Sequence, residues 1–299
     1  GAGNGFVSPE GIAVDAAGNV YVTAINSDNA FKITPSGVIT EIIDATGDGA
    51  GNILNNPFDI AVDAVGNVYV PGANSDNAFK ITPTGVVTEI IDATGDGAGN
   101  GLDFAYFIAV DAAGNVFVTG LVSDNAFKIT PAGIITEIID FTGDGAGNGL
   151  DSPVGIVLDA AGNAFVAGNL SDNAFMITPA GVITEIIDFT GDGAGNGLNG
   201  GTGIVVDGAG NAYVTGFLSD NALKIAVSAP DPIPGDMDCS GGVGTDDVEL
   251  FVEAVLDPAA FDASHPDCDS SGADVNGDTE VNGGDVPGFV ACVLSGGCQ

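Results

Sequence analysis

The chain has 299 residues, of which 41 are acidic and four are basic, giving a formal net charge of −37. This length suffices for a sizeable core in one or two domains. Since the only basic residues are four lysines, the chain cannot form a basic surface that would bind nucleic acid. The sequence also lacks a run of about 18 apolar residues, so it does not indicate insertion into a membrane.

A repeat of 48 residues dominates the sequence. The tetrapeptide Ser-Asp-Asn-Ala starts at Ser27, Ser75, Ser123, Ser171 and Ser219. A fixed period of this size indicates a solenoid or a propeller. Five near-copies of one unit supply a scaffold or a multivalent surface, whereas an enzyme needs one asymmetric site. The only histidine, His265, lies outside the repeats. We therefore expect that the chain is not an enzyme.

Each repeat contains four short strand patterns, which the third copy shows clearly. Residues 108–110 precede a turn that contains Gly114, and residues 116–119 are β-branched or aromatic. Residues 126–130 and 134–139 follow, separated by a Pro-Ala-Gly turn, and a glycine-rich connection leads to the next copy. Four short strands per repeat are typical of a propeller blade, so we predict an all-β, five-repeat β-propeller.

The last blade is predicted to be incomplete. The first three strand patterns occur five times, but the fourth occurs four times, at residues 38–44, 86–92, 134–140 and 182–188. An open strand edge is a site of association that proteins usually cover. Residues 226–228 can cover it within the chain, residues upstream of Gly1 can do so, or a neighbouring molecule can donate a strand.

The repeats resemble a known family of propellers. Residues 11–22, Gly-Ile-Ala-Val-Asp-Ala-Ala-Gly-Asn-Val-Tyr-Val, and residues 30–40, Ala-Phe-Lys-Ile-Thr-Pro-Ser-Gly-Val-Ile-Thr, are similar to NHL repeats. The resemblance covers about residues 1–227 and implies the propeller fold. The family includes lyases, lactonase-like enzymes, RNA binders and adhesive ectodomains. Asn29-Ala30 stands where the family often has Asn-Arg or His-Arg, so the basic face of an RNA-binding member is missing.

The connections on one face of the predicted disc differ between the copies. They carry large apolar residues, among them Phe58, residues 104–107 and Phe217. Such residues indicate an interface, although neutral drift of loops gives the same pattern. In each glycine-rich connection on this face, an aspartate is followed four residues later by an asparagine. This pattern is typical of an ordinary turn and is also compatible with a weak calcium site. These aspartates are Asp48, Asp96, Asp144 and Asp192.

The tail differs in composition from the repeats. We assign residues 1–228 to the propeller, 229–234 to a Pro-rich linker and 235–299 to a small α-helical domain with two EF-hand-like loops. The first loop has its ligand positions at Asp236, Asp238, Ser240, Gly242 and Asp247, and the second at Asp274, Asn276, Asp278, Glu280 and Asp285. Calcium takes six to eight oxygen ligands, and this spacing wraps them around one ion, so we predict calcium as the cofactor.

A closing aspartate, with Asp-Val-Asn-Gly-Asp at residues 274–278, resembles a type I dockerin. That resemblance implies paired loops that fold around calcium and can dock a cohesin. The recognition positions fall at Thr245-Asp246 and Gly283-Gly284, which lack the usual hydroxyl pair, so a cohesin partner is not expected. The four cysteines, Cys239, Cys268, Cys292 and Cys298, predict two disulfides of open pairing that form outside the cytosol.

The sequence therefore favours a secreted, acidic extracellular or cell-surface protein. Residues 1–5 repeat residues 97–101, so the chain begins within a repeat, which we interpret as a processed or truncated form without its leader. Near-identical blades and the unfilled strand position favour a calcium-stabilised structural protein that self-assembles into filaments. The alternative is a monomeric binding module for glycan or protein ligands, which an aromatic-lined pocket on the variable face would favour.

Overall fold

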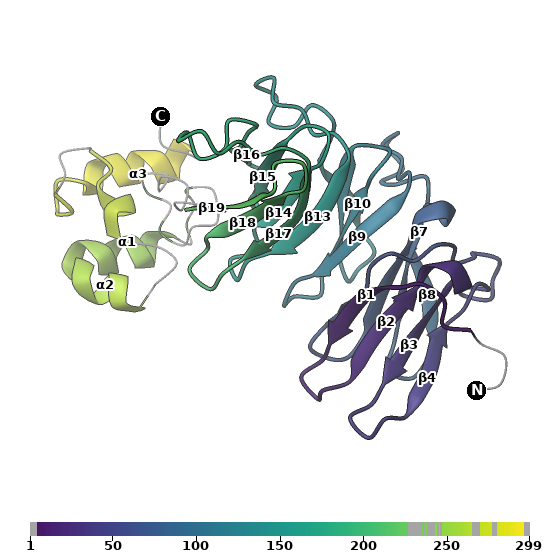
Figure 1. Ribbon diagram of the computed structural model, residues 1–299. Helices are drawn as coiled ribbons and strands as arrows, with labels where there is room; N and C mark the ends of the chain where they lie inside the picture. The colour runs from purple at the N-terminus through teal and green to yellow at the C-terminus, as the bar shows by residue number, and fades with distance from the viewer. Residues whose placement is uncertain are drawn as a thin grey trace. The chain divides into compact units, whose positions relative to one another are not determined.

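The computed structural model describes residues 5–226 without a gap and, in the remainder, residues 235, 237, 243, 245, 247–264, 270–276 and 280–295 (Figure 1). The chain divides into two compact units. The first comprises Gly1–Ile177 and Ile183–Ala226, and the second comprises Thr178–Val182 and Val227–Gln299.

The first unit consists of five antiparallel sheets whose strands follow chain order. The first two are β1 (Pro9–Val14), β2 (Val20–Ala24), β3 (Asn29–Ile33) and β4 (Ile39–Ile43), then β5 (Ala61–Val62), β6 (Val68–Gly72), β7 (Asn77–Ile81) and β8 (Val87–Ile91). The next two are β9 (Ala105–Val110), β10 (Val116–Gly120), β11 (Asn125–Ile129) and β12 (Ile135–Ile139), then β13 (Pro153–Leu158), β14 (Ala164–Gly168), β15 (Asn173–Ile177) and β16 (Ile183–Ile187). The fifth is β17 (Gly201–Val206), β18 (Ala212–Gly216) and β19 (Asn221–Ile225).

These sheets confirm the five predicted blades. Among the described residues four sheets have four strands, and the fifth has three, the last of which is β19. Ala226, which follows β19, is not in a strand, and residues 227 and 228 lie outside the described part of the chain. The three ways of covering the open edge therefore stay open.

The turn between the first two strands of each sheet is closed by its own side chains. In the third repeat the backbone N–H of Asn115 donates to Asp111 Oδ1 at 2.8 Å, and Asn115 Nδ2 donates to Asp111 Oδ2 at 2.6 Å. Gly114 lies between them with a φ of 82°, a left-handed conformation that glycine adopts without steric cost. The Asp-x-x-Gly-Asn pattern therefore specifies a turn.

The cores lie between neighbouring sheets. Phe117 and Ala126 of the third sheet pack with Ile156, Val166 and Phe175 of the fourth. β9 contacts β13, and β13 contacts β17, so each inner sheet buries both of its faces (Figure 1). Alternation of side chains along each strand places one apolar set on each face.

A second contact joins the sheets through the Ser-Asp-Asn triplet. In each triplet the aspartate is left-handed, with φ between 49° at Asp28 and 55° at Asp172. In the first four triplets its carboxylate accepts a hydrogen bond from a backbone N–H at the start of the next repeat. The four bonds are Asn56 N to Asp28 Oδ1 (2.8 Å), Phe104 N to Asp76 Oδ1 (2.9 Å), Ser152 N to Asp124 Oδ1 (2.8 Å) and Gly200 N to Asp172 Oδ1 (2.7 Å).

The described residues of the second unit include helices and a 3₁₀ turn. Its elements are α1 (Asp247–Leu256), α2 (Pro258–Ser264), a 3₁₀ turn (Ser270–Ala273) and α3 (Val286–Ser295). The rings of Phe251 and Phe289 stack with their centroids 3.8 Å apart, and Phe261 is fully buried beside them. Cys292 is disulfide-bonded, and the other three cysteines lie outside the described residues. None of the described helices combines the length and apolar character needed to cross a membrane.

The inter-repeat hydrogen bond can be tested by replacing Asp124 with alanine. We expect Asp124→Ala to lower the free energy of unfolding by about 1–2 kcal/mol more than Asp220→Ala does. Asp220 has the same left-handed conformation in the last repeat, where no following repeat is described, so both variants share the loss of charge and the backbone strain. Chemical denaturation measures both, and equal losses would contradict the role of this bond.

Candidate functional site

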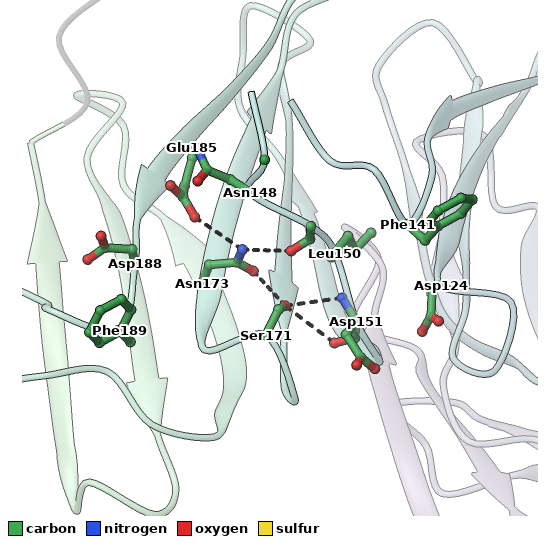
Figure 2. A pocket seen from close by; sticks show the side chains of 12 residues that line it. Asp124, Phe141, Asn148, Leu150, Asp151, Ser171, Asn173, Glu185, Asp188 and Phe189 are labelled. Atoms are coloured by element: carbon green, nitrogen blue, oxygen red, sulfur yellow. Dashed lines mark hydrogen bonds between the residues drawn. The ribbon is translucent and has the colours of Figure 1, made fainter. Parts of the chain in front are cut away.

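Two equivalent cavities lie on the face that carries the glycine-rich connections. We name them by the sheets they join. The 3–4 pocket has a volume of about 540 Å³ and is lined by Asp124, Phe141, residues 147–151, Ser171, Asn173, Glu185, Asp188 and Phe189 (Figure 2). The 2–3 pocket, of about 500 Å³, is lined by the residues that stand one repeat earlier. The repeat therefore produces a repeated cavity of the size that takes a small ligand.

A hydrogen-bond network holds the wall of the 3–4 pocket. Asn173 Nδ2 donates to the carbonyl of Gly149 at 2.8 Å and to Glu185 Oε1 at 3.1 Å. Ser171 Oγ donates to Asn173 Oδ1 at 2.7 Å and accepts from the backbone N–H of Asp151 at 3.1 Å (Figure 2). Asn173 is buried, so its bonds fix the orientation of Glu185 and the path of the connection.

The pocket carries four carboxylates, those of Asp124, Asp151, Glu185 and Asp188. Burial raises the pKa of Glu185, an effect that the hydrogen bond from Asn173 opposes and the charges of Asp188 and Asp144 reinforce. Hydrogen bonds from the side chain and backbone of Thr190 lower the pKa of Asp188. The pocket is therefore rich in hydrogen-bond acceptors and repels anions.

Aromatic rings distinguish the two pockets. Phe141 and Phe189 are each 67% exposed, and both line the 3–4 pocket, on opposite sides of the Asn173 network (Figure 2). In the 2–3 pocket the equivalent positions are Ala93 and Phe141. The 3–4 pocket thus offers two exposed rings, and the 2–3 pocket offers one.

The aspartates of the glycine-rich connection take part in turns. The backbone N–H of Ala146 donates to Asp144 Oδ1 at 2.8 Å, and Asn148 Nδ2 donates to Asp144 Oδ2 at 2.8 Å. The same bonds recur at Asp48, Asp96 and Asp192. Of the two interpretations of this motif, the geometry favours the turn.

A further cluster of side chains is not repeated. Phe58, Phe104, Tyr106 and Phe107 come together where the second and third repeats enter their first strands. The ring centroids of Phe58 and Tyr106 are 4.5 Å apart, and those of Tyr106 and Phe107 are 4.9 Å apart. Phe104 has a φ of 59°, which is rare for a bulky residue and costs conformational energy. The cluster is an asymmetric feature among otherwise similar repeats.

Two unusual polar groups neighbour this cluster in sequence. Asp59 Oδ2 accepts a hydrogen bond from the backbone N–H of Ile108 at 3.0 Å, yet burial raises the pKa of Asp59 to about 6. Asn56 Oδ1 is buried without a hydrogen-bond partner among the described residues. Groups of this kind gather at functional sites more often than elsewhere. The equivalent of Asp59 in the other repeats is Gly11, Phe107, Gly155 or Gly203.

Half of the predicted calcium ligands lie in the described part of the chain. Asp247 is the first residue of α1 and accepts a hydrogen bond from the backbone N–H of Met237 at 2.7 Å. Asp285 precedes α3 and accepts from the backbone N–H groups of Asn276 at 3.2 Å and Asn282 at 2.9 Å. Both carboxylates are buried, and each folds back over its own loop. This arrangement fits the closing position of an EF-hand-like loop.

The other eight predicted calcium ligands are only partly described. Asp274, Asn276 and Glu280 are described, whereas Asp236, Asp238, Ser240, Gly242 and Asp278 lie outside the described residues. Among the residues that are described, no three histidine, cysteine, aspartate or glutamate side chains lie close enough together to hold a metal ion. Calcium binding by these loops therefore stays a prediction.

Solved structures of other proteins resemble the fold of this chain. No protein-family model and no curated protein matches the sequence. Virginiamycin B lyase from Staphylococcus aureus matches with a TM-score of 0.57 at 19% identity, over 77% of this chain and 73% of the lyase. A chain of a nidogen/laminin complex matches with a TM-score of 0.55 at 20% identity, over 73% and 76%. A putative gluconolactonase matches with a TM-score of 0.51 at 12% identity, over 75% and 79%.

The repeats form a β-propeller fold. The resemblance to NHL propellers is confirmed at the level of the fold. The dockerin-like resemblance of the second unit stays a prediction, since these matches do not show it.

The comparison corrects one expectation. We expected that the chain is not an enzyme, and this is contradicted because a lyase and a putative gluconolactonase have similar structures. The error was to treat near-identical repeats as lacking an asymmetric site. The cluster around Tyr106, with Asp59 beside Phe58 in the chain, shows that the repeats are not equivalent. At these identities the likeness itself shows the fold alone.

The raised pKa of Asp59 predicts a specific pH dependence. Because the folded protein favours the neutral carboxyl, ionisation of Asp59 costs stability; this cost is fully present above pH 6 and is lost as the pH falls from about 6 to the ordinary pKa of 3.8. We expect Asp59→Asn to stabilise the protein by about 1–2 kcal/mol at pH 7.5, with the gain vanishing near pH 4. Thermal unfolding over this range, with Asp220→Asn as the exposed control, measures it. A gain that does not change with pH would contradict the assignment.

Proposed function

We propose that this chain is a secreted extracellular protein that binds neutral glycans in the acidic, phenylalanine-flanked pockets between its repeats. The observation that carries the proposal is the 3–4 pocket, where exposed Phe141 and Phe189 flank four carboxylates in a cavity of about 540 Å³. Sugars present both hydroxyl donors and an apolar face of C–H groups. The carboxylates accept hydrogen bonds from the hydroxyls, and the phenylalanine rings pack on the apolar face.

The charge of the pocket narrows the ligand class. Asp124, Asp151, Glu185 and Asp188 surround the cavity, and the whole chain carries a net charge of −37. Sulfated or uronic-acid glycans would place like charges together without a basic group to compensate them, so they are disfavoured. Neutral hexose units fit this environment.

The repeat makes the binding multivalent. Because the 2–3 and 3–4 pockets are related by one repeat, a glycan chain that spans both can bind more tightly than a single sugar unit. This gain needs no further contact, since the second binding event is intramolecular. The proposal therefore favours polysaccharides over monosaccharides as ligands.

A structural, self-assembling role is a second candidate function. It is favoured by a specific observation, the near-identity of the repeats, which supplies similar surfaces several times in one chain. In either role we propose that the second unit binds calcium through the ligand positions Asp236, Asp238, Ser240, Gly242, Asp247, Asp274, Asn276, Asp278, Glu280 and Asp285. Because calcium would bind the folded protein and not the unfolded chain, it would stabilise the fold.

Glycan binding is tested by removing the rings one at a time. We expect Phe189→Ala to weaken binding to the 3–4 pocket by about tenfold, because one stacking contact is lost. Phe141→Ala should weaken binding more, since Phe141 lines both pockets. A neutral-glycan array selects the ligand, and isothermal titration calorimetry measures its affinity. Phe217→Ala is the matched control, because Phe217 is 71% exposed but lines neither pocket.

Two results would overturn the glycan proposal. One is an array on which no neutral glycan binds to the wild-type protein. The other is an affinity that Phe189→Ala and Phe217→Ala reduce equally, because the pocket would then not be the site.

Calcium binding is tested on the full chain. We expect calcium to raise the midpoint of the helical circular-dichroism transition and a chelator to lower it. Asp285→Asn should weaken calcium binding at least about tenfold, because the closing carboxylate is a principal ligand of such loops. Asp220→Asn in the last propeller repeat is the control. Titration calorimetry without a calcium-binding signal in the wild-type protein would exclude these sites.

A further inference from the structure

Three half-buried aromatic rings meet where the second and third sheets begin. They belong to Phe58, Phe104 and Tyr106, and we call them the ring cluster. The centroid of Tyr106 lies 4.5 Å from that of Phe58 and 5.9 Å from that of Phe104, while Phe58 and Phe104 are 6.1 Å apart. The second and third sheets each contact a described sheet on both sides. The ring cluster therefore lies away from the first and last sheets.

The backbone of Phe104 adopts a conformation that the other repeats reach with small or polar residues. Its φ is 59°, and the equivalent residues have φ between 53° and 65°. They are Ser8, Asn56, Ser152 and Gly200. A bulky residue is rare in this left-handed region and costs conformational energy there. Because Phe104 is only half-buried, a contact at the surface explains its presence better than packing in a core does.

Tyr106 differs from the other tyrosines in its hydroxyl group. The hydroxyls of Tyr21, Tyr69 and Tyr213 each donate to an aspartate of a neighbouring turn, at distances of 2.9 to 3.0 Å. The hydroxyl of Tyr106 has no hydrogen-bond partner among the described residues. A tyrosine hydroxyl usually finds a partner when it is buried. The hydroxyl of Tyr106 is therefore available to a ligand.

A carboxylate lies close to the ring cluster. Glu10 stands in the first repeat where Phe58 and Tyr106 stand in the second and third. Burial raises the pKa of Tyr106, and the negative charge of Glu10 reinforces this shift, which places Glu10 within electrostatic reach of the ring. The faces of aromatic rings are themselves electron-rich. Ring faces and carboxylate together give this site a negative potential.

The protein has no lysine or arginine left to neutralise this site. All four of its basic side chains are lysines, and each lies over another ring, at 5.4 to 5.8 Å from the centroid. The pairs are Lys32 with Tyr21, Lys80 with Tyr69, Lys128 with Phe117 and Lys224 with Tyr213. The fold thus uses contacts between cations and rings within three of its first four sheets and in the fifth. The ring cluster has the same chemistry without a cation from the chain.

We propose that the ring cluster binds a small quaternary ammonium compound, whose cationic group lies against the rings beside the carboxylate of Glu10. A cation within about 6 Å of a ring centroid is attracted by the ring, and aromatic sites recognise quaternary ammonium groups in this way. The methyl groups of the ligand pack on the rings, and the hydroxyl of Tyr106 hydrogen-bonds to a polar substituent. None of the three rings lines the 2–3 or the 3–4 pocket, so this site is independent of glycan binding.

Charge also narrows the ligand. A phosphate on the same molecule would meet the carboxylate of Glu10 and a net charge of −37. We therefore expect choline to bind more tightly than phosphocholine, and a free ammonium compound to be preferred over a phosphate-bearing lipid head group.

Titration of choline into the full chain, followed by NMR, tests the site. The chain has only four tyrosines, so labelling the tyrosine rings gives a small set of signals, and Tyr106→Phe assigns the one from Tyr106. We expect choline to shift this signal and to leave those of Tyr21, Tyr69 and Tyr213 in place. The neutral isostere of choline, in which carbon replaces the nitrogen, should bind at least about tenfold more weakly because it lacks the attraction of a cation to the rings.

Variants identify the groups that bind. Tyr106→Val introduces the residue that the fourth repeat has at this place, Val154, and should weaken choline binding at least about tenfold in titration calorimetry. Glu10→Gln should weaken it about threefold or more, since it removes the nearby charge. Asp220→Asn is the matched control, because it removes one charge from an exposed side chain of the last repeat. It should bind choline like the wild type.

Three results would overturn the proposal. The first is a wild-type protein in which choline neither shifts the Tyr106 signal nor produces heat. The second is equal affinity for choline and its neutral isostere, because the rings would then be an apolar surface only. The third is an equal loss in Glu10→Gln and Asp220→Asn, which would indicate attraction by the overall charge. Circular dichroism of the variants must match the wild type, and Phe58→Thr, with the residue of the fifth repeat, replaces Tyr106→Val if that variant does not fold.

Discussion

The hydrogen bond from a left-handed aspartate to the next repeat is the constraint on which the propeller fold depends. Asp28, Asp76, Asp124 and Asp172 each accept from a backbone N–H that lies 28 residues further along the chain. The bond holds the start of each later sheet against the previous one, beside the apolar faces that pack together. The left-handed conformation also explains why an aspartate occupies this place, since short polar side chains tolerate it better than most. Sheet packing and hydrogen bonding therefore reinforce the same arrangement.

The flanking residues of the same triplet build the pocket. In the fourth repeat, Ser171 and Asn173 stand on either side of Asp172 and hold the connection and Glu185 in place. One tripeptide thus joins two sheets and shapes the cavity between them. The double role of the Ser-Asp-Asn triplet accounts for its presence in all five repeats, because a change at any of its three residues disturbs either the packing of the sheets or the wall of the pocket.

The sequence allowed the strands and the turns to be predicted, because they depend on local patterns such as Asp111 to Asn115. The pockets were not predicted, because their walls come from residues as far apart as Asp124 and Phe189. The raised pKa of Asp59 was missed for the same reason, since it results from burial against the third repeat. Periodicity reveals what the repeats share, but an asymmetric site depends on how they differ.

The differences between repeats are not spread evenly. At the position of Phe189 the first two repeats have Ala45 and Ala93, while the third and fourth have Phe141 and Phe189. The aromatic cluster around Tyr106 instead joins the second and third repeats. These substitutions leave the hydrogen bonds between neighbouring repeats in place, because they lie outside the Ser-Asp-Asn triplet. A framework that tolerates such changes can keep the contacts between its repeats while the pockets diverge, so ligand binding can change without loss of the fold.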